Sequence, residues 1–536
     1  MKKVYLPILI TTILLLASNL PAVEITYNVT SGGKSSSLTT DYDLSAGSRA
    51  DSQIDITSNP SISSHTNVNA QGDENNIEVT TGANDGAGST SNASVRILDN
   101  VETASINTNA NASNSTQASA NATGTGAMAG YIKGESDGTK KFCAFTGDFD
   151  ASSDAGGGNV GITSNYTKAN ANIFIVTKDQ NNTPCHDTVY DDIPDVFDPN
   201  TGPPETPSNK EGRPDYAFVD HGGFTGAEID TKPDLTLSGV WGADNTTIDG
   251  RDGGGDTLYV HNSPNFTVEG FTVTGGTNVD EKNLELENGG VTDRTLGNGI
   301  SIYNSDNATV RDNTVSGNAW HGIHLIAGGF NEVTGNTANK NGIAGIFVFS
   351  GDNVTVTCNT ANGNGLAGIG VSSDGNATVT GNTANENGGF GIGVWPDGNA
   401  TVTGNTANEN GGFGIEVLSV GDATVTGNTA NGNGGFGIGV LSVGNATVTG
   451  NTANGNGVGI YIAGFGGTAK VNYNNIFSNT VGLLNDTGKN VNAEENWWGP
   501  GGTGGPGEGP AGNKNNGVFN VGTGTTDFTP WSNVKF

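Results

Sequence analysis

The sequence is poor in large apolar side chains and in charge. Hydrophobic residues make up 33 % and charged residues 14 % of 536 residues, whereas about 25 % are charged in ordinary globular proteins. Glycine takes their place, with 86 residues, or about 16 % against a usual ~7 %. The low charge excludes a highly charged disordered chain, and the lack of a Gly-X-Y period excludes collagen. The composition therefore favours an elongated fold with a narrow core.

Basic side chains are scarce as well. The chain has 22 Lys and Arg against 54 Asp and Glu, a formal net charge of −32, and residues 341–469 contain neither Lys nor Arg. Nucleic-acid binding requires Lys and Arg to neutralise phosphates, so we expect no nucleic-acid partner. Anionic membrane surfaces are disfavoured for the same reason, and the acidity favours solubility.

The one apolar run long enough to matter lies at the N-terminus. Lys2 and Lys3 precede the apolar stretch 4–17, and Leu20-Pro21-Ala22 offers small residues for cleavage. This arrangement is typical of a secretory signal peptide and is too short for a lasting anchor. We expect residues 1–22 to be removed and the mature protein to be secreted or at the cell surface, with no membrane span.

Cysteine is nearly absent. The three cysteines are Cys143, Cys185 and Cys358. Export permits a disulfide between Cys143 and Cys185, and three unpaired thiols are the alternative.

A 23-residue repeat dominates the second half of the chain. The block Gly-Asn-Thr-Ala-Asn recurs at this step, and two asparagine columns keep it for eight turns. The columns are Asn313, Asn336, Asn359, Asn382, Asn405, Asn428, Asn451 and Asn474, and Asn318, Asn341, Asn364, Asn387, Asn410, Asn433, Asn456 and Asn479. Gly-Ile-X-Val and Ala-Thr-Val-Thr alternate inward and outward residues, which indicates short strands, and Asn-Gly and Gly-Gly supply the corners between them.

Three strands and three corners in 23 residues predict one coil of a parallel β-solenoid. Coils ~4.8 Å apart would pair their backbones and stack a few Ile and Val residues into a continuous core. Asparagines at one corner would hydrogen-bond along the axis as a ladder. We expect an all-β protein with about eleven coils from Trp241 to Trp498, interrupted by an insertion at 277–297.

These residues resemble a known family. The pattern Asn…Asn-Gly-X-X-Gly-Ile-X-Val…Asn-Ala-Thr-Val is similar to right-handed parallel β-helix repeat proteins, which include pectate-lyase-like enzymes, NosD-type periplasmic proteins and many surface proteins. The end, Asn496-Trp-Trp-Gly-Pro with Asp527-Phe-Thr-Pro-Trp531, is similar to that of secreted members. The resemblance implies a right-handed parallel β-helix over residues 215–500 and a Gly-rich C-terminal cap over 501–536; it specifies the fold better than an activity.

Two further segments precede the repeat. Residues 23–185 are rich in Ser, Thr, Asn, Ala and Gly with scattered apolar alternation, which predicts a β-rich region, with a partly ordered stalk as the alternative. Prolines crowd the acidic stretch 186–214, which predicts a stiff linker between two domains.

The irregular first coils hold the best candidate site. The register places Tyr259, Ser301, His324, Phe347 and Glu416 in one outward column, His261, Tyr303, Phe349 and Trp395 in the next, and Arg311, Asp312, Trp320 and His321 nearby. Aromatic rings at coil spacing suit sugar rings, so the candidate carbohydrate contacts are Tyr259, His261, Tyr303, Trp320 and His324. The candidate catalytic residues are His321, His324, Arg311 and Asp312, with histidine as acid or base. Surface residues without any ligand are the alternative.

Two other patterns have simpler interpretations. Phe390, Phe413 and Phe436 share a column, which predicts a stacking ladder between coils rather than a ligand groove. Asp249, Asp252 and Asp256 could bind Ca²⁺ through hard oxygens, but Asp/Gly-rich corners usually bind nothing. We therefore expect no metal or cofactor.

The sequence favours an exported structural or adhesive β-helix protein that contacts extracellular polysaccharide or cell-envelope components. The alternative is a polysaccharide lyase or glycoside hydrolase, although residues 341–469 cannot supply the cation that a lyase needs for a substrate carboxylate. A NosD-like role in metal-enzyme maturation is a third hypothesis. Only Met128 remains after signal removal, which disfavours thioether copper ligation.

Overall fold

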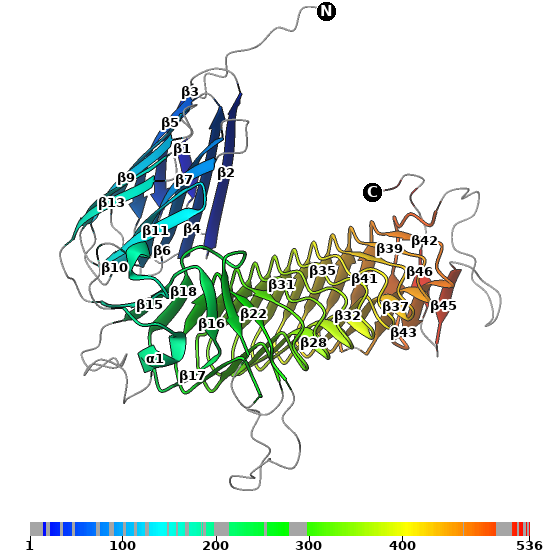
Figure 1. Ribbon diagram of the computed structural model, residues 1–536. Helices are drawn as coiled ribbons and strands as arrows, with labels where there is room; N and C mark the ends of the chain where they lie inside the picture. The colour runs from blue at the N-terminus through cyan, green and yellow to red at the C-terminus, as the bar shows by residue number, and fades with distance from the viewer. Residues whose placement is uncertain are drawn as a thin grey trace, which may run out of the picture. The chain divides into compact units, whose positions relative to one another are not determined.

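The computed structural model describes the strands and tight turns of residues 14–197 and, further on, residues 214–250, 254–277, 297–464, 466–499, 517–521, 525–528, 532 and 535. The chain divides into two compact units, Met1–Asp220 and His221–Phe536. Each unit is built almost entirely of strands (Figure 1). No helix among the described residues is both long and apolar enough to cross a membrane. Residues 278–296 of the predicted insertion and most of the cap at 501–536 lie outside the described residues.

The first unit contains two sheets, in the strand orders β1-β3-β5-β8-β9-β12-β13 and β11-β10-β7-β6-β4-β2. Pairing is parallel between β2 and β4 and antiparallel between β7 and β10, so the β-rich prediction is confirmed. The strands of these sheets are β1 (Leu14–Ala17), β2 (Ala22–Gly32), β3 (Ser36–Leu44), β4 (Arg49–Asn59), β5 (Ser61–Ala70), β6 (Asn75–Asn84), β7 (Thr90–Asp99), β8 (Thr103–Asn111), β9 (Ser115–Thr123), β10 (Met128–Ser136), β11 (Thr139–Thr146), β12 (Phe149–Gly156) and β13 (Asn159–Tyr166). Outside these two sheets, β14 (Asn172–Val176) and β15 (Asp215–Val219) pair with each other in parallel.

Cys143 of β11 forms a disulfide with Cys185, which confirms the predicted pair, and Cys358 is an exposed thiol. After η1 (Gln180–Asn182), the short helix α1 (Ile193–Phe197) contacts β14 and buries Ile193 and Val196. These apolar residues, three apart on one helix face, fold part of the expected linker onto the first unit. Signal-peptide cleavage stays a prediction.

The second unit is a parallel β-helix, as predicted, and its coils contribute strands to three sheets. Sheet 1 contains β17 (Ala227–Asp230), β20 (Leu258–His261), β23 (Ile300–Tyr303), β26 (Ile323–Ala327), β28 (Ala344–Ser350), β30 (Ala367–Ser373), β32 (Phe390–Pro396), β34 (Ile415–Ser419), β37 (Phe436–Ser442), β40 (Val458–Ala463), β43 (Val481–Asp486) and β45 (Gly517–Asn520). Each strand pairs in parallel with the strand one coil away, so these strands follow one another along the helix (Figure 1).

Sheets 2 and 3 complete the coils. Sheet 2 contains β18 (Leu235–Gly239), β21 (Thr267–Glu269), β24 (Thr309–Arg311), β27 (Asn331–Thr334), β29 (Val354–Thr357), β31 (Ala377–Thr380), β33 (Ala400–Thr403), β35 (Ala423–Thr426), β38 (Ala446–Thr449), β41 (Ala469–Asn472), β44 (Val491–Asn492) and β46 (Thr526–Asp527). Sheet 3 contains β16 (Gly222–Thr225), β19 (Thr246–Asp249), β22 (Thr272–Thr274) and β25 (Thr314–Val315), then single bridges, then β36 (Thr429–Asn431), β39 (Thr452–Asn454) and β42 (Asn475–Phe477).

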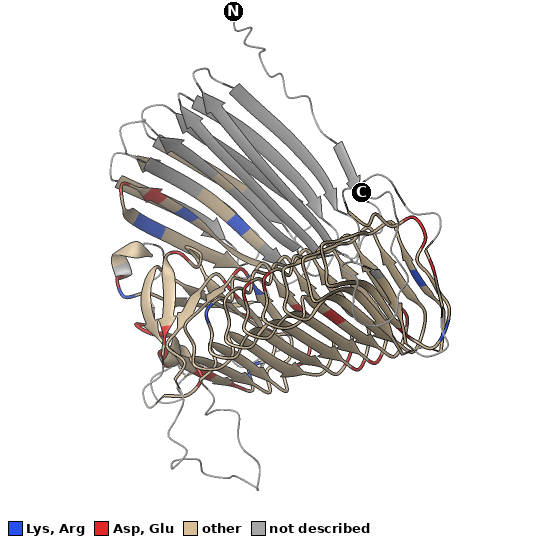
Figure 2. Cartoon of the chain, turned by 90° about the vertical axis from the view of Figure 1, so that its right-hand side faces the viewer, with Lys and Arg blue, Asp and Glu red and all other residues tan. Residues whose placement is uncertain are grey.

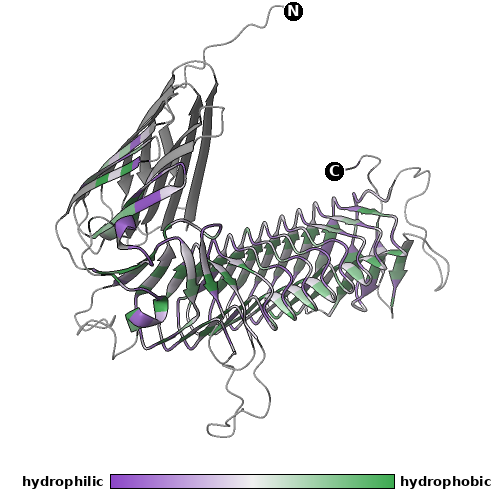
Figure 3. Cartoon of the chain, in the orientation of Figure 1, coloured by the Kyte–Doolittle hydropathy of each residue, from purple (hydrophilic) through white to green (hydrophobic). Residues whose placement is uncertain are grey.

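The core of the β-helix is narrow. Ile346 and Val348 of sheet 1 and Ala377 and Val379 of sheet 2 point inward and are buried, and their equivalents in other coils repeat the pattern. Figure 3 shows hydrophobic colouring along the strands and hydrophilic colouring at many corners. Charged residues are sparse along the coils, as Figure 2 shows. A few aliphatic side chains per coil are therefore enough to fill the core of the β-helix.

Both asparagine columns form the predicted ladders. Nδ2 of Asn382 donates to Oδ1 of Asn405 at 2.9 Å, and the backbone N–H of Asn382 donates to the same oxygen at 2.9 Å. Nδ2 of Asn382 also donates to the carbonyl of Val356 at 2.8 Å. In the second column, Asn387 donates to Asn410 at 3.0 Å. These buried amides are matched, so the corners can be buried without large apolar residues.

The phenylalanine ladder is present in part. Phe413 stacks on Phe436 with ring centroids 5.0 Å apart, and Phe436 stacks on Tyr461 at 4.4 Å. Phe390 instead meets the ring of Trp395 edge-on at 5.5 Å. Trp395 can lie there because Gly393 has no side chain; a Cβ on Gly393 would lie 2.3 Å from the indole.

Candidate functional site

The outward face of sheet 1 displays the irregular residues of the first coils. The register is the one predicted: Tyr259 pairs with Ser301, Ser301 with His324, and His324 with Phe347. In the neighbouring column, His261 pairs with Tyr303. Alternate residues of a strand point to opposite faces, so both columns lie outside the core.

The rings of this face form a continuous network. Tyr259 lies 5.0 Å from His261 and 6.2 Å from Tyr303, measured between ring centroids. Tyr303 in turn lies 5.9 Å from His324, edge to face. These separations fall in the range of favourable aromatic pairs, so rings of three coils form one linked cluster on this side of sheet 1.

The turn before β26 extends the network. His321 lies 4.9 Å from His324 and stacks on Phe347 at 5.4 Å, and Trp320 meets His321 edge-on at 6.0 Å. The backbone N–H of His321 is held by Oδ1 of Asn298 at 3.0 Å, which fixes this turn. The structure therefore brings together six of the predicted residues: Tyr259, His261, Tyr303, Trp320, His321 and His324.

Two histidines of the network are buried without a full set of partners. His321 and His324 are 8 % and 6 % exposed. Within the described part of the chain, Nδ1 of each, and Oη of Tyr303, have no hydrogen-bond partner. Burial lowers the pKa of His321 to about 4. Burial, reinforced by His321, lowers the pKa of His324 to about 3. Both imidazoles are therefore neutral at pH 7.

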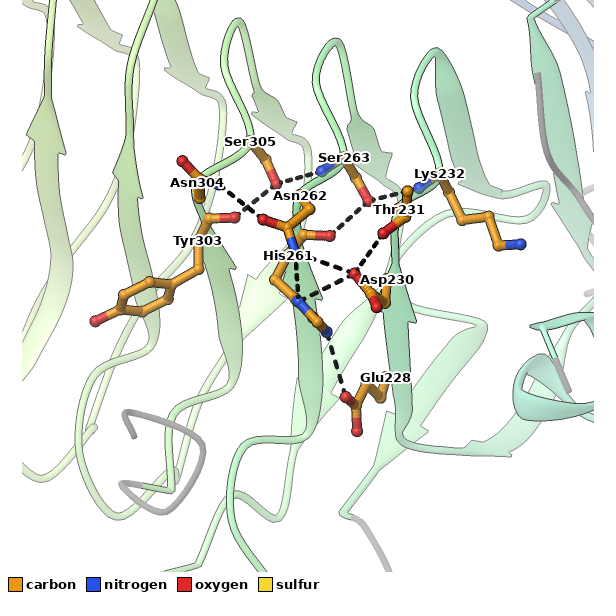
Figure 4. Close-up of polar contacts among 10 residues, drawn as sticks. All are labelled: Glu228, Asp230, Thr231, Lys232, His261, Asn262, Ser263, Tyr303, Asn304 and Ser305. Carbon is orange, nitrogen blue, oxygen red and sulfur yellow. Dashed lines mark hydrogen bonds and ion pairs between the residues drawn. The ribbon is translucent and has the colours of Figure 1, made fainter. Parts of the chain in front are cut away.

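His261 stands between two carboxylates at the N-terminal end of this face (Figure 4). Its Nε2 lies 3.3 Å from Oε1 of Glu228, and its Nδ1 lies 3.1 Å from Oδ1 of Asp230. Burial would raise the pKa of Asp230, but hydrogen bonds from Thr231 and Asn262 and nearby basic charges outweigh it and lower that pKa. Acid, base and stacking groups thus share one face.

Comparison with known proteins places this geometry in a family. The family model described as right handed β-helix region matches residues 221–384 and 353–497, more than half of the chain. The chain belongs to the right-handed β-helix family. No curated protein sequence matches it.

Several solved β-helix structures are similar. The A-module of mannuronan C-5 epimerase AlgE6 from Azotobacter vinelandii is 16 % identical, with a TM-score of 0.42, and the match covers 58 % of this chain and 90 % of that one. For the AlgE4 A-module of the same organism the values are 16 %, 0.43, 60 % and 91 %. Pectate lyase Pel9A is 17 % identical, with a TM-score of 0.32, and the match covers 50 % and 71 %. These likenesses concern the fold.

Sequence reasoning missed Glu228 and Asp230 of this β-helix. They lie on β17, next to Tyr259 and His261 of β20. The signal was available in Ala-Glu-Ile-Asp, which alternates as Leu-Tyr-Val-His does. The 23-residue spacing does not predict this pairing, because Asp230 and His261 are 31 positions apart in the sequence.

Two proposed catalytic residues lie elsewhere on the β-helix. Arg311 ends β24 in sheet 2, where its Nε donates to Oε2 of Glu269, a buried carboxylate. Asp312 follows at a corner, with a φ of 56°. The structure therefore does not bring Arg311 and Asp312 into the ring network with His321 and His324.

The aspartates proposed for Ca²⁺ have different surroundings. Asp256 is buried, and its Oδ1 accepts the N–H of Asn298 at 2.7 Å as part of a corner. Asp249 is exposed at the end of β19, and Asp252 lies outside the described residues. Among the residues that the structure describes, no group of three His, Cys, Asp or Glu is placed to hold a metal.

Proposed function

We propose that this protein is an exported β-helix protein that binds extracellular polysaccharide on the outward face of sheet 1. The ring network from His261 to Phe347 carries the proposal. Aromatic side chains offer flat apolar surface on which sugar rings can stack. Oη of Tyr303 and Nδ1 of His321 and His324 are buried and unmatched within the described residues, so a side-chain rotation that brings them to the surface would give sugar hydroxyls hydrogen-bond partners. The signal-peptide pattern supports export.

The charges near the network favour a neutral saccharide. Glu228 and Asp230 flank its N-terminal end, and Glu416 lies further along the same column. The coils from 341 to 469 contain no Lys or Arg. A uronate polymer running along this face would meet carboxylates without compensating cations, so we expect neutral polysaccharides to bind more tightly than uronates.

Affinity electrophoresis of the full-length protein, in gels containing neutral or uronate polysaccharides, tests the proposal. Tyr303→Ala removes the central ring and should weaken binding about tenfold, since an aromatic contact is worth up to ~1.5 kcal/mol. Phe413→Ala, in the structural stack, is the matched control and should be retarded like the wild type. Circular dichroism checks that both variants fold. Equal retardation of the wild type and Tyr303→Ala contradicts the proposal.

His261 and its two carboxylates favour a second candidate function, cleavage of the bound polysaccharide. Glu228 and Asp230 lie within 3.3 Å of the imidazole, a geometry suited to general acid–base catalysis. Release of reducing ends would indicate hydrolysis, and release of unsaturated products would indicate lyase action. His261→Gln should abolish product formation while polysaccharide binding persists. No product from any polysaccharide that the wild type binds would leave binding as the function.

A further inference from the structure

Sheet 2 presents a second outward face of quite different character. Five successive strands, β29, β31, β33, β35 and β38, end in Thr-Val-Thr, with the valine buried and both threonines outward. Strict register stacks the threonines in two columns. The columns are Thr355, Thr378, Thr401, Thr424 and Thr447, and Thr357, Thr380, Thr403, Thr426 and Thr449. We call these ten residues the threonine face.

Two adjacent threonine columns distinguish this face from sheet 3, which repeats a single column through Thr337, Thr360, Thr383, Thr406 and Thr429, and from the outward face of sheet 1. In the same stretch, one outward column of sheet 1 holds Phe347, Gly370, Gly393, Glu416 and Gly439. β-Propensity alone would allow any strand-forming residue at an exposed position, and the sheet 1 column accepts even Gly and Glu. The coils therefore repeat threonine on one outward face while they vary the other.

The threonine face is uncharged, and most of its hydroxyls are available. All ten residues are half-buried or exposed. Within the described residues, the hydroxyl of Thr357 bonds to that of Thr334 at 3.0 Å, and no protein group is bonded to the other nine. The charged residues Glu332 and Lys470 lie at the two ends of the column that runs from Thr355 to Thr447.

The spacing of this grid is close to that of crystalline water. Strands lie ~4.8 Å apart and alternate residues along a strand ~6.7 Å apart. Water oxygens ~2.8 Å apart in a tetrahedral hydrogen-bonded lattice have second neighbours about 4.5 Å apart, close to the strand spacing. Threonine is restricted at χ1, so hydroxyl and methyl groups are held in order.

We infer that the threonine face binds ice. A regular, rigid grid of hydroxyl and methyl groups matches a crystalline surface better than a flexible ligand. A sugar site would call for aromatic rings and a few convergent polar groups, which sheet 1 has and this face lacks. The inference does not depend on the function proposed for sheet 1.

Growth of single ice crystals in solutions of the purified full-length protein tests the inference. The wild type should facet the crystals and halt their growth over an interval below the melting point. The double variant Thr401→Lys/Thr424→Lys places two long charged chains in the centre of the face and should lose both effects. Ser372→Lys/Leu418→Lys adds the same charges to the outward face of sheet 1 and should keep them. Circular dichroism and thermal unfolding check that each variant folds.

Round ice discs that grow as fast with the wild type as with buffer would overturn the inference. Undiminished ice shaping by the folded Thr401→Lys/Thr424→Lys variant would also overturn it. Retention on crystalline cellulose or chitin that requires Thr401 and Thr424, without any effect on ice, would reassign the face to a solid polysaccharide. Each of these results leaves the gel retardation expected for sheet 1 unaffected.

Discussion

His321 and His324, in the first coils, occupy positions that hold phenylalanine or glycine in the regular repeat. Three 23-residue steps after His321 and His324, the chain has Phe390 and Gly393. The imidazoles are buried among rings, and the described residues leave Nδ1 of each without a hydrogen-bond partner. Protonating a ring at such a buried position costs stability. The free energy of unfolding should therefore depend on pH through these two histidines.

Replacing His321 by Phe should make the protein less sensitive to acid. An unfolded histidine titrates near 6.5, and the folded pKa of His321 is about 4. Between these values the unfolded chain binds more protons, so the free energy of unfolding falls as pH drops from 6.5 to 4. The contribution of His321 is on the order of 3 kcal/mol. Urea unfolding of the wild type and His321→Phe from pH 7 to pH 4 measures it, and parallel pH curves would contradict the expectation.

A single ladder asparagine should matter far more than an exposed threonine. Asn405→Ala leaves the N–H and Nδ2 of Asn382 without their acceptor and the carbonyl of Val379 without its donor. Each orphaned buried group costs about 1–3 kcal/mol, so we expect a loss of roughly 3 kcal/mol or more in guanidinium unfolding. Thr424→Ala removes an exposed hydroxyl and should change stability by less than about 0.5 kcal/mol. Similar losses in both variants would argue against the ladder.

Among the strands and corners, the features that recur at a fixed spacing could be predicted from the sequence. Asn382 and Asn405 lie one step apart, so their stacking could be counted from the sequence, and the columns of Tyr259 and His261 followed from strand alternation. The position of Arg311 could not be counted in this way. Ten residues before His321, it lies in a different sheet, because the corner at Asp312 and a short strand of sheet 3 intervene. Nor does composition reveal which polar atoms of a buried ring cluster lack partners.

Glycine at a close contact between coils should be sensitive to substitution. A Cβ on Gly411 would lie 2.2 Å from the carbonyl oxygen of Gly388, and backbone cannot rotate away. We expect Gly411→Ala to cost about 1–3 kcal/mol. Gly223 in β16 has open space around its Cβ position and no positive φ, so Gly223→Ala should be neutral or stabilise by up to about 1 kcal/mol. Thermal unfolding of both variants distinguishes them, and equal midpoints would refute the close contact.

At the scale of the whole molecule, the β-helix should tolerate loss of a complete coil. Deleting residues 404–426 removes 23 residues and joins Thr403 to Gly427, which recreates the natural Thr426–Gly427 junction. Since repeat stability is roughly a sum of repeat and nearest-neighbour terms, the variant should fold with a modestly lower free energy of unfolding. Deleting residues 404–415 breaks the register and should abolish cooperative unfolding. The reverse ranking by circular dichroism would contradict the 23-residue coil.

We propose that the outward face of sheet 1 at the first coils holds a saccharide. A crystal structure of the full-length protein with the neutral oligosaccharide that binds best tests it most directly. We predict a sugar ring stacked on the accessible side of the ring network, against the half-buried rings of Tyr303 and Trp320. A saccharide bound on another face, with the ring network empty, would contradict the claim.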